Sequence, residues 1–295
     1  MTFNKATAIG LVAILLWSTI VGLMRSVTGA LGAVGGAAMI YTLSSLILIL
    51  TVGFPKISKF PRKYLIWGGL LFVVYELCLS LSVGLAKSDS QAIEVSMVNY
   101  LWPSMTLLLA CIADGKKLRP LMLGGMLVCL AGVGKVIGGA NGLSIPGMID
   151  NLASNPISYG LAFSGAIIWS VYCVLTKKIA EGCNGITLFF MLTAAVLWLK
   201  FSLSDNVHMD FTPTVIVNLL LVAGSMGLGY AAWNTGILHG NVTVLATASY
   251  FIPVLSALFA ALLLGESLGY TFWIGALMVS FGSVLCWWVT RKREY

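Results

Sequence analysis

Residues 92–113 form an apolar stretch of helical length that carries Asn99-Tyr100-Leu101-Trp102-Pro103 at its middle. Proline has no backbone N–H and clashes with the carbonyl four residues before it, so it interrupts a helix. Here the carbonyl that loses its partner belongs to Asn99. The sequence therefore predicts a broken helix with a free hydrogen-bond acceptor near its centre.

The same pattern returns 150 residues later, in residues 242–264, which carry Ser249-Tyr250-Phe251-Ile252-Pro253. At membrane depth, irregular backbone is tolerated only where protein or a wet cavity satisfies it. Matching breaks in two halves of a chain are typical of transporter binding sites. The alternative is a pair of packing kinks in a helical bundle. We expect the helix-breaking Pro103 and Pro253 to mark a central cavity.

The composition places the chain in a membrane, because 59% of its residues are hydrophobic and only 9% are charged, against about 25% charged in soluble domains. The net charge of +7 does not indicate nucleic acid, since the basic residues lie between apolar runs and not in one patch. Six cysteines are scattered without metal-ligand spacing, so neither a disulfide framework nor a metal site is indicated.

A membrane-spanning helix needs about 20 mostly apolar residues, and ten segments meet this requirement. They are residues 6–24, 35–54, 64–86, 92–113, 120–138, 158–176, 185–204, 215–238, 242–264 and 270–290. The seventh is short before its flanking lysine. The predicted fold class is an all-α integral membrane protein with ten transmembrane helices.

The basic residues predict the orientation. If the N-terminus is cytoplasmic, 13 of the 17 lysines and arginines lie on the inner side. The four left for the outer side are Arg25, Lys87, Lys135 and Lys200. The positive-inside rule then places both termini in the cytoplasm, as an even number of spans requires.

The two halves resemble each other beyond the prolines. The matches are Gly125 with Gly275 and Gly132 with Gly282 at an offset of 150, and Trp17-Ser18 with Trp169-Ser170 and Gly84 with Gly236 at an offset of 152. Five helices per copy is an odd number, so the second copy enters the membrane upside down. This predicts an inverted 5+5 repeat with a site near the midplane. Residues 1–138 form the first five-helix unit, 139–157 a linker or an ordered external cap, and 158–295 the second unit.

Aromatic and amide side chains lie unusually deep in the predicted spans, although Trp and Tyr normally gather at the membrane interfaces. Spacings of three and four residues place several of them on shared helical faces, which would suit a flat substrate. Large aromatics that only fill the bundle interior are the alternative. The candidate substrate-binding residues are Trp17, Tyr75, Glu76, Asn99, Tyr100, Trp102, Trp169, Tyr172, Tyr230, Trp233, Asn234, Ser249 and Tyr250.

Glu76 is the one acidic residue near the centre of a predicted span. A charge there costs on the order of 3 kcal/mol or more, so such residues face the interior and are candidates for function. Three roles are open: accepting a substrate ammonium group, carrying a proton during transport, or serving as a protonated structural residue bonded to a neighbouring helix.

The sequence does not favour an enzyme. His208 and His239 are the only histidines, and they fall in predicted loops on opposite sides of the membrane. Neither a metalloprotease motif nor a Ser-His-Asp set can be assembled from them. We expect no cofactor and no catalytic residue, and the partners we expect are a small-molecule substrate and the lipid bilayer. The oligomeric state is left open, with a monomer as one option.

Several runs carry a family resemblance over nearly the whole chain. The repeat, the Trp-Ser pairs and Leu262-Leu263-Leu264-Gly265-Glu266 resemble the EamA branch of the drug/metabolite transporter superfamily. Longer runs, including Val98-Asn99-Tyr100-Leu101-Trp102-Pro103-Ser104 and Ala231-Ala232-Trp233-Asn234, resemble the YddG-type aromatic amino acid exporters. The first copy has Gly115-Lys116 in place of the Gly-Glu ending.

This resemblance implies export of phenylalanine, tyrosine and tryptophan from the cytoplasm across the inner membrane by alternating access. A transporter of another metabolite or of a cationic drug is the nearest alternative. A non-transporting membrane sensor or subunit is a more distant one, since it would not require matched helix breaks around a cavity.

Overall fold

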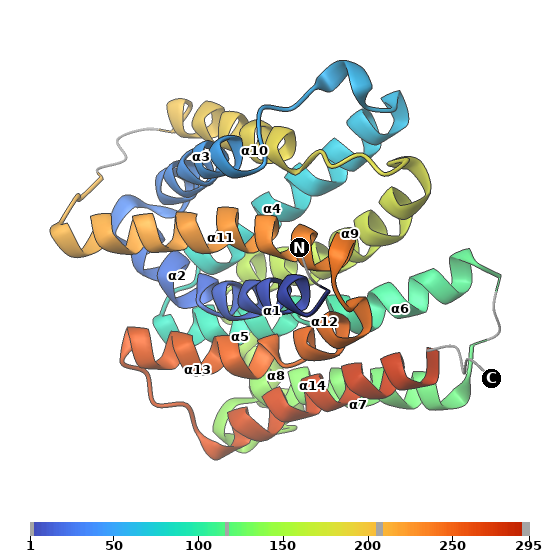
Figure 1. Cartoon of the computed structure of the whole chain (residues 1–295). Helices are drawn as coiled ribbons and strands as arrows, with labels where there is room; N and C mark the ends of the chain where they lie inside the picture. The colour runs from blue at the N-terminus through green and yellow to red at the C-terminus, as the bar shows by residue number, and fades with distance from the viewer. Residues whose placement is uncertain (1–2, 116–117, 205–208, 291–295) are drawn as a thin grey trace.

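The computed structural model describes residues 3–115, 118–204 and 209–290. Within these ranges the regular structure is helical, with no β-strand (Figure 1). The first half of the chain contains α1 (Phe3–Ser18), α2 (Ile20–Leu31), α3 (Ala33–Thr51), η1 (Ile57–Lys59), η2 (Tyr64–Gly68), α4 (Gly69–Gly84), α5 (Asp89–Asn99), α6 (Trp102–Ala113) and α7 (Pro120–Ile137). The second contains η3 (Gly139–Asn141), α8 (Ile145–Ser154), α9 (Pro156–Ile179), α10 (Ile186–Ser202), α11 (Pro213–His239), α12 (Val242–Ser249), α13 (Ile252–Leu264) and α14 (Tyr270–Thr290).

Within the part of the chain that the structure describes, eight helical stretches are long and apolar enough to cross a membrane. They are Asn4–Leu31, Ala33–Thr51, Tyr64–Gly84, Asp89–Ala113, Pro120–Ile137, Pro156–Ile179, Pro213–Trp233 and Tyr270–Val289. Two further apolar helices, Ile186–Ser202 and Ile252–Leu264, are shorter. The predicted span 185–204 coincides with the first, and the predicted span 242–264 is divided between α12 and the second. Helix length alone therefore gives eight spans, and the chain is a multi-pass α-helical membrane protein.

Both predicted helix breaks are present, and their backbone hydrogen bonds match. After α5, the Leu101 N–H donates to the Val98 carbonyl over 3.2 Å; after α12, the Phe251 N–H donates to the Ala248 carbonyl over 3.1 Å. Each proline is the second residue of the helix that follows, α6 or α13. At that position the missing proline N–H would have had no partner in the helix anyway.

A third break, which the sequence analysis missed, separates α1 from α2 at Thr19. The Thr19 hydroxyl donates to the Leu16 carbonyl over 2.7 Å and lies 3.0 Å from the hydroxyl of Ser225 in α11. Threonine hydroxyls offer the backbone an alternative to regular helical bonding. The first span is thus also interrupted, without a proline.

Helices α7 and α14 meet backbone to backbone at glycines. A methyl group on Gly125 would lie 2.9 Å from the carbonyl oxygen of Gly282, and one on Gly132 would lie 2.7 Å from the carbonyl oxygen of Gly275. Small residues let membrane helices approach this closely, which maximises their van der Waals contact. These four glycines form what we call the glycine seam, and they are the glycines that the repeat pairs in sequence.

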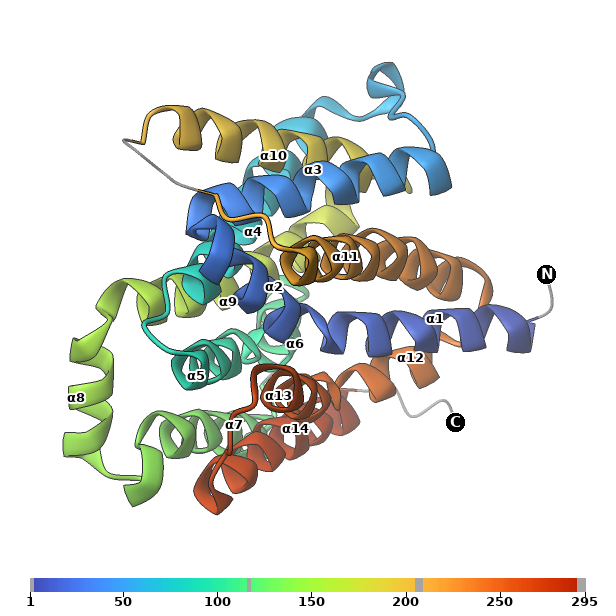
Figure 2. The same ribbon diagram turned by 90° about the vertical axis from the view of Figure 1, so that its left-hand side faces the viewer.

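The remaining helices pack in pairs across the two halves of the chain. α1 packs on α11, α4 on α9, and α3 on α10. α1 begins and α14 ends at the same end of the bundle, away from α8 (Figure 2). Residues 139–157, expected to link two units, hold η3 and α8, so this connection is ordered.

The end of the bundle near α8 is tightly packed. The short helices α2, α5 and α13 pack against one another there, and a methyl group on Gly22 would lie 2.9 Å from the α-carbon of Ala260. Arg25 forms an ion pair with Asp89 at 2.8 Å and donates to the Ala86 carbonyl. Ser90 donates to Glu266 over 2.6 Å. We call these two side-chain contacts, Arg25 with Asp89 and Ser90 with Glu266, the end latch.

Candidate functional site

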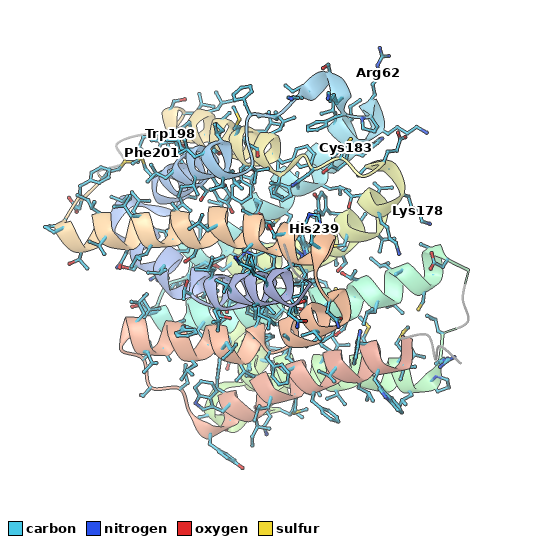
Figure 3. All side chains as sticks on the ribbon, viewed as in Figure 1. Arg62, Lys178, Cys183, Trp198, Phe201 and His239 are labelled. Atoms are coloured by element: carbon cyan, nitrogen blue, oxygen red, sulfur yellow. The ribbon has the colours of Figure 1, made fainter. Side chains whose placement is uncertain are left out.

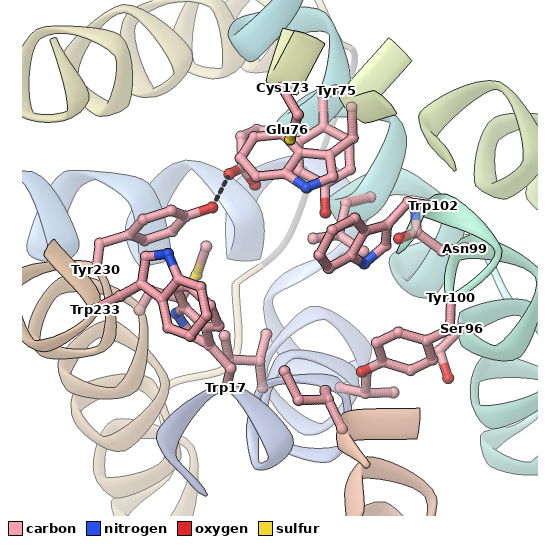
Figure 4. A pocket seen from close by; sticks show the side chains of 16 residues that line it. Trp17, Tyr75, Glu76, Ser96, Asn99, Tyr100, Trp102, Cys173, Tyr230 and Trp233 are labelled. Carbon is pink, nitrogen blue, oxygen red and sulfur yellow. Dashed lines mark hydrogen bonds between the residues drawn. The ribbon is translucent and has the colours of Figure 1, made fainter. Parts of the chain in front are cut away.

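The three helix breaks surround a cavity of about 220 Å³ at the middle of the bundle (Figure 4). Its walls come from α1, α2, α4, α5, α6, α9, α11 and α13, together with Tyr100 at the first predicted break. The lining residues are Trp17, Ile20, Val21, Tyr75, Glu76, Leu79, Ser96, Asn99, Tyr100, Trp102, Trp169, Cys173, Met226, Tyr230, Trp233 and Ile252.

One wall is an aromatic cluster from α1 and α11. The Trp17 ring centre lies 5.1 Å from that of Tyr230, in an edge-to-face arrangement, and 5.2 Å from that of Trp233. Tyr230 and Trp233 are three residues apart on α11, so their side chains share one helical face. Trp17 reaches them from the last turn of α1, just before the break at Thr19.

The facing wall is a stack of three rings from α4 and α9. Trp169 stacks on Tyr75, with ring centres 4.4 Å apart, and on Tyr172, with ring centres 4.8 Å apart. Trp102, at the start of α6, meets Trp169 edge to face at 6.3 Å. Pairs of this kind contribute about 0.5–1.5 kcal/mol each beyond the area they bury, so the rings stabilise one another's positions.

Glu76 lies between the two walls, and its side chain is fully buried. Tyr41 of α3 donates a hydrogen bond to Oε2 over 2.6 Å, and Tyr230 of α11 donates one to Oε1 over 3.1 Å. The carboxyl group thus joins α4 to α3 and α11. A carboxylate can accept about four hydrogen bonds, so two tyrosines leave it capacity for a ligand.

Two buried N–H donors at the cavity have no hydrogen-bond partner among the described residues, the Asn99 amide nitrogen and the Trp17 indole nitrogen. Each lies against a glycine. A methyl group on Gly165 would lie 3.0 Å from Asn99 Nδ2, and one on Gly229 would lie 2.6 Å from Trp17 Nε1. The absent side chains of Gly165 and Gly229 therefore make room for these two groups.

Nine of the thirteen candidate residues line the cavity: Trp17, Tyr75, Glu76, Asn99, Tyr100, Trp102, Trp169, Tyr230 and Trp233. Tyr172 is buried behind Trp169. Tyr250 is buried with its ring near Trp287, and Ser249 is buried outside the lining set. Asn234 lies on α11, but its side chain falls outside the described part of the structure. Pro103 and Pro253 are buried at the starts of α6 and α13.

Sequence reasoning missed seven lining residues: Ile20, Val21, Leu79, Ser96, Cys173, Met226 and Ile252. Ser96 and Cys173 lie one helical turn from Asn99 and Trp169, so the three- and four-residue spacing could have found them. The five apolar residues also stand three or four residues from a candidate. An aliphatic side chain that faces a cavity cannot, however, be told in sequence from one that faces lipid.

No group of three or more His, Cys, Asp and Glu side chains that could hold a metal gathers among the residues the structure describes. The six cysteines all lie within the described residues, and none of them is part of a disulfide. The chemistry available at the cavity is therefore that of aromatic faces, one carboxyl group and a few neutral donors.

Replacing Trp169 with leucine should weaken binding of an aromatic ligand most among single aromatic changes. It removes the middle ring of the stack and with it four ring contacts, to Tyr75, Tyr172, Trp102 and Phe72, each worth about 0.5–1.5 kcal/mol. We expect the KM of transport to rise about tenfold or more. Trp288→Leu is the matched control, because Trp288 is 47% exposed on the outside of the bundle. Equal KM values for both variants would contradict a binding role for the stack.

Comparison with known proteins agrees with this picture. The model of the EamA-like transporter family matches residues 156–288. Over 99% of this chain and 100% of the relative, the sequence is 56% identical to the aromatic amino acid exporter YddG of Salmonella typhimurium and 55% identical to that of Escherichia coli. A third relative of that name, from Ancylobacter novellus, is 30% identical over 88% of both chains.

A solved crystal structure matches all of this chain and all of its own with a TM-score of 0.71 and 24% sequence identity, a likeness of fold alone. The named relatives are transporters, in agreement with the expectation of transport and not catalysis. Full-length identity above one half, together with the family match, establishes the relationship: this chain belongs to the EamA-like transporter family.

Proposed function

We propose that this protein exports aromatic amino acids from the cytoplasm across the inner membrane. The observation that carries the proposal is the cavity between two aromatic walls with a buried carboxyl group beside them. It occurs in a chain whose full-length relatives, at 55–56% identity, are named aromatic amino acid exporters. Phenylalanine, tyrosine and tryptophan are the substrates.

In this proposal the substrate ring lies between the Trp17 cluster and the Trp169 stack. Its ammonium group faces Glu76, which keeps free acceptor capacity beside the tyrosines. The carbonyl of Asn99, a lining residue that stands four residues before Pro103, adds a further acceptor at the same depth.

The architecture we propose is an inverted 5+5 repeat of ten spans, with units 1–138 and 158–295 joined by 139–157. The glycine seam supports it. The repeat equates Gly125 with Gly275 and Gly132 with Gly282, whereas in space Gly125 meets Gly282 and Gly132 meets Gly275. Each glycine thus contacts the copy of the other one, as a two-fold axis requires. The helix pairs α1–α11 and α4–α9 exchange under the same operation.

Transport would follow by alternating access, with the half-bundles rocking about the central cavity. The packing at the two ends supports this. The repeat pairs α2 with the second half of α9, α5 with α12, and α13 with α6, so the cluster of α2, α5 and α13 at the α8 end corresponds to these three segments at the opposite end. The first cluster is closed, whereas the main contacts of α12 are with α1 and α11. The protein is then in a state closed at the α8 end.

Both termini are cytoplasmic in this proposal, so the α8 end faces outward. Arg62 and Lys178 lie at one end of the bundle, opposite Trp198 and Phe201 (Figure 3), which agrees with a basic inner face. A C-terminal fusion to green fluorescent protein should fluoresce, and one to alkaline phosphatase should be inactive, because only the cytoplasm lets the first fold and only the periplasm activates the second. The reverse result would overturn the orientation.

Reconstitution into liposomes tests the function. Protein-containing liposomes should take up labelled phenylalanine faster than empty ones, and unlabelled tyrosine and tryptophan should compete. Absence of protein-dependent flux for all three amino acids would reject the proposal. Competition only by unrelated solutes would point to a transporter of another substrate.

A further inference from the structure

The charges at the cavity fit a cation better than a zwitterion. We infer that the same cavity also transports primary arylalkylamines, the decarboxylated counterparts of the aromatic amino acids, as ammonium cations. The inference rests on the proposed function, since it uses the same site and the same ring-binding walls. What it adds is that the site recognises the ammonium group of the substrate and does not require the carboxylate.

The cavity has an acid without a base. Among the described residues that line it, Glu76 is acidic and none is lysine, arginine or histidine. Arg25, at the closed end, is already engaged by Asp89 and by the Ala86 carbonyl. A buried charge needs a partner of opposite sign or good hydrogen bonds. The site supplies such a partner to an ammonium group and none to a carboxylate.

The surroundings of Glu76 strengthen its preference for a cation. Tyr41 and Tyr230 occupy one acceptor position on each carboxyl oxygen, and about two of four positions remain. The rings of Tyr75 and Tyr230 lie beside it (Figure 4). Aromatic faces attract ammonium groups through the ring quadrupole, most strongly where water is excluded. The carboxyl group and the rings therefore act in the same direction.

The donors available to a substrate carboxylate are weak by comparison. The unpaired nitrogens of Asn99 and Trp17 are neutral, and each lies against a glycine, Gly165 or Gly229. An amino acid must surrender the hydration of its carboxylate to such donors, whereas the corresponding amine has no carboxylate to desolvate. We therefore expect the amine to bind at least as tightly as the amino acid with the same ring.

Three probes that share the same 4-hydroxyphenyl ring separate these contributions. Tyrosine carries both charged groups, tyramine carries only the ammonium group, and 3-(4-hydroxyphenyl)propionate carries only the carboxylate. Each is tested as a competitor of labelled phenylalanine uptake into proteoliposomes. Tyramine should inhibit at a concentration no higher than tyrosine does, and the propionate should need at least about tenfold more. A propionate that competes better than tyramine would overturn the inference.

Direct uptake of labelled tyramine is measured alongside, at about pH 6, where an alkylamine is almost wholly protonated, with empty liposomes subtracted. Uptake of both phenylalanine and tyramine supports the function and the inference together. Phenylalanine uptake without tyramine uptake overturns the inference alone. Tyramine uptake without phenylalanine uptake overturns the proposed function alone. If neither enters, both are wrong.

A matched pair of variants assigns the effect to Glu76. Glu94 also accepts a hydrogen bond from a tyrosine, Tyr159, over 2.9 Å, but it does not line the cavity. Glu76→Gln should raise the inhibitory concentration of tyramine at least about tenfold and that of the propionate little or not at all. Glu94→Gln should leave the order of the three probes unchanged. If the three probes kept the same order of inhibitory concentrations in Glu76→Gln, the Glu76 carboxyl group would have no role in substrate recognition.

Discussion

Leucine in place of Gly125 should leave little folded protein. A methyl group there would lie 2.8 Å from the sulfur of Cys286 and 2.9 Å from the carbonyl oxygen of Gly282, and the backbone of α14 cannot move aside as a flexible side chain can. Overpacking typically costs 1–3 kcal/mol, and a leucine meeting backbone should exceed about 3 kcal/mol. Thermal unfolding of the detergent-solubilised protein measures the loss.

The preceding residue provides the control. Gly124 lies on the same helix, and a side chain added to it would meet nothing within 4 Å. Gly124→Leu should unfold near the wild-type temperature or above it, because leucine favours a helix more than glycine does, by somewhat under 1 kcal/mol. If the two leucine variants were equally stable, the glycine seam would not hold α7 to α14.

Glutamine in place of Glu76 should abolish any response of transport to a proton gradient. Glutamine keeps the size of the side chain and an oxygen acceptor for a tyrosine, but it cannot take up or release a proton. In liposomes, an imposed pH difference should change the rate of phenylalanine flux through the wild-type protein and leave the rate through Glu76→Gln unaffected. A gradient response that persists in the variant would exclude Glu76 as the proton carrier.

The groups around Glu76 make this assignment specific. Tyr41 of α3 and Tyr230 of α11 bond to it, and the other ionisable side chains that line the cavity within the described residues are Tyr75, Tyr100 and Cys173. Tyrosine and cysteine titrate well above neutral pH in their unperturbed state. Glu94→Gln again serves as the control, and its gradient response should equal that of the wild type.

The helix breaks were predictable because their cause is local. Pro103 and Pro253 lack a backbone N–H whatever surrounds them, so the sequence alone places both interruptions. The break at Thr19 has a tertiary component, since its hydroxyl meets Ser225 across a helix interface. The local sequence around Thr19 does not predict that contact.

The sequence could predict which side chains of the site share a helical face, but no more than that. Spacing correctly grouped Tyr230 with Trp233, but it could not say which neighbouring helix each face meets. Tyr172 therefore proved to lie behind Trp169, and Tyr250 beside Trp287. The unpaired nitrogens of Asn99 and Trp17 could not be foreseen either, because they depend on Gly165 and Gly229 in other helices.

Contact between α7 and α14 also limits how the two halves can move. In the present register, a methyl group added to any of the four glycines would lie 2.5–2.9 Å from a carbonyl oxygen of the opposite helix. A slide of one residue would bring larger side chains against those oxygens, whereas a small tilt would not. We therefore expect these two helices to behave as a hinge pin, with displacements that grow with distance from it. The helices farthest from α7 and α14 would then move most, while α7 and α14 themselves would move least.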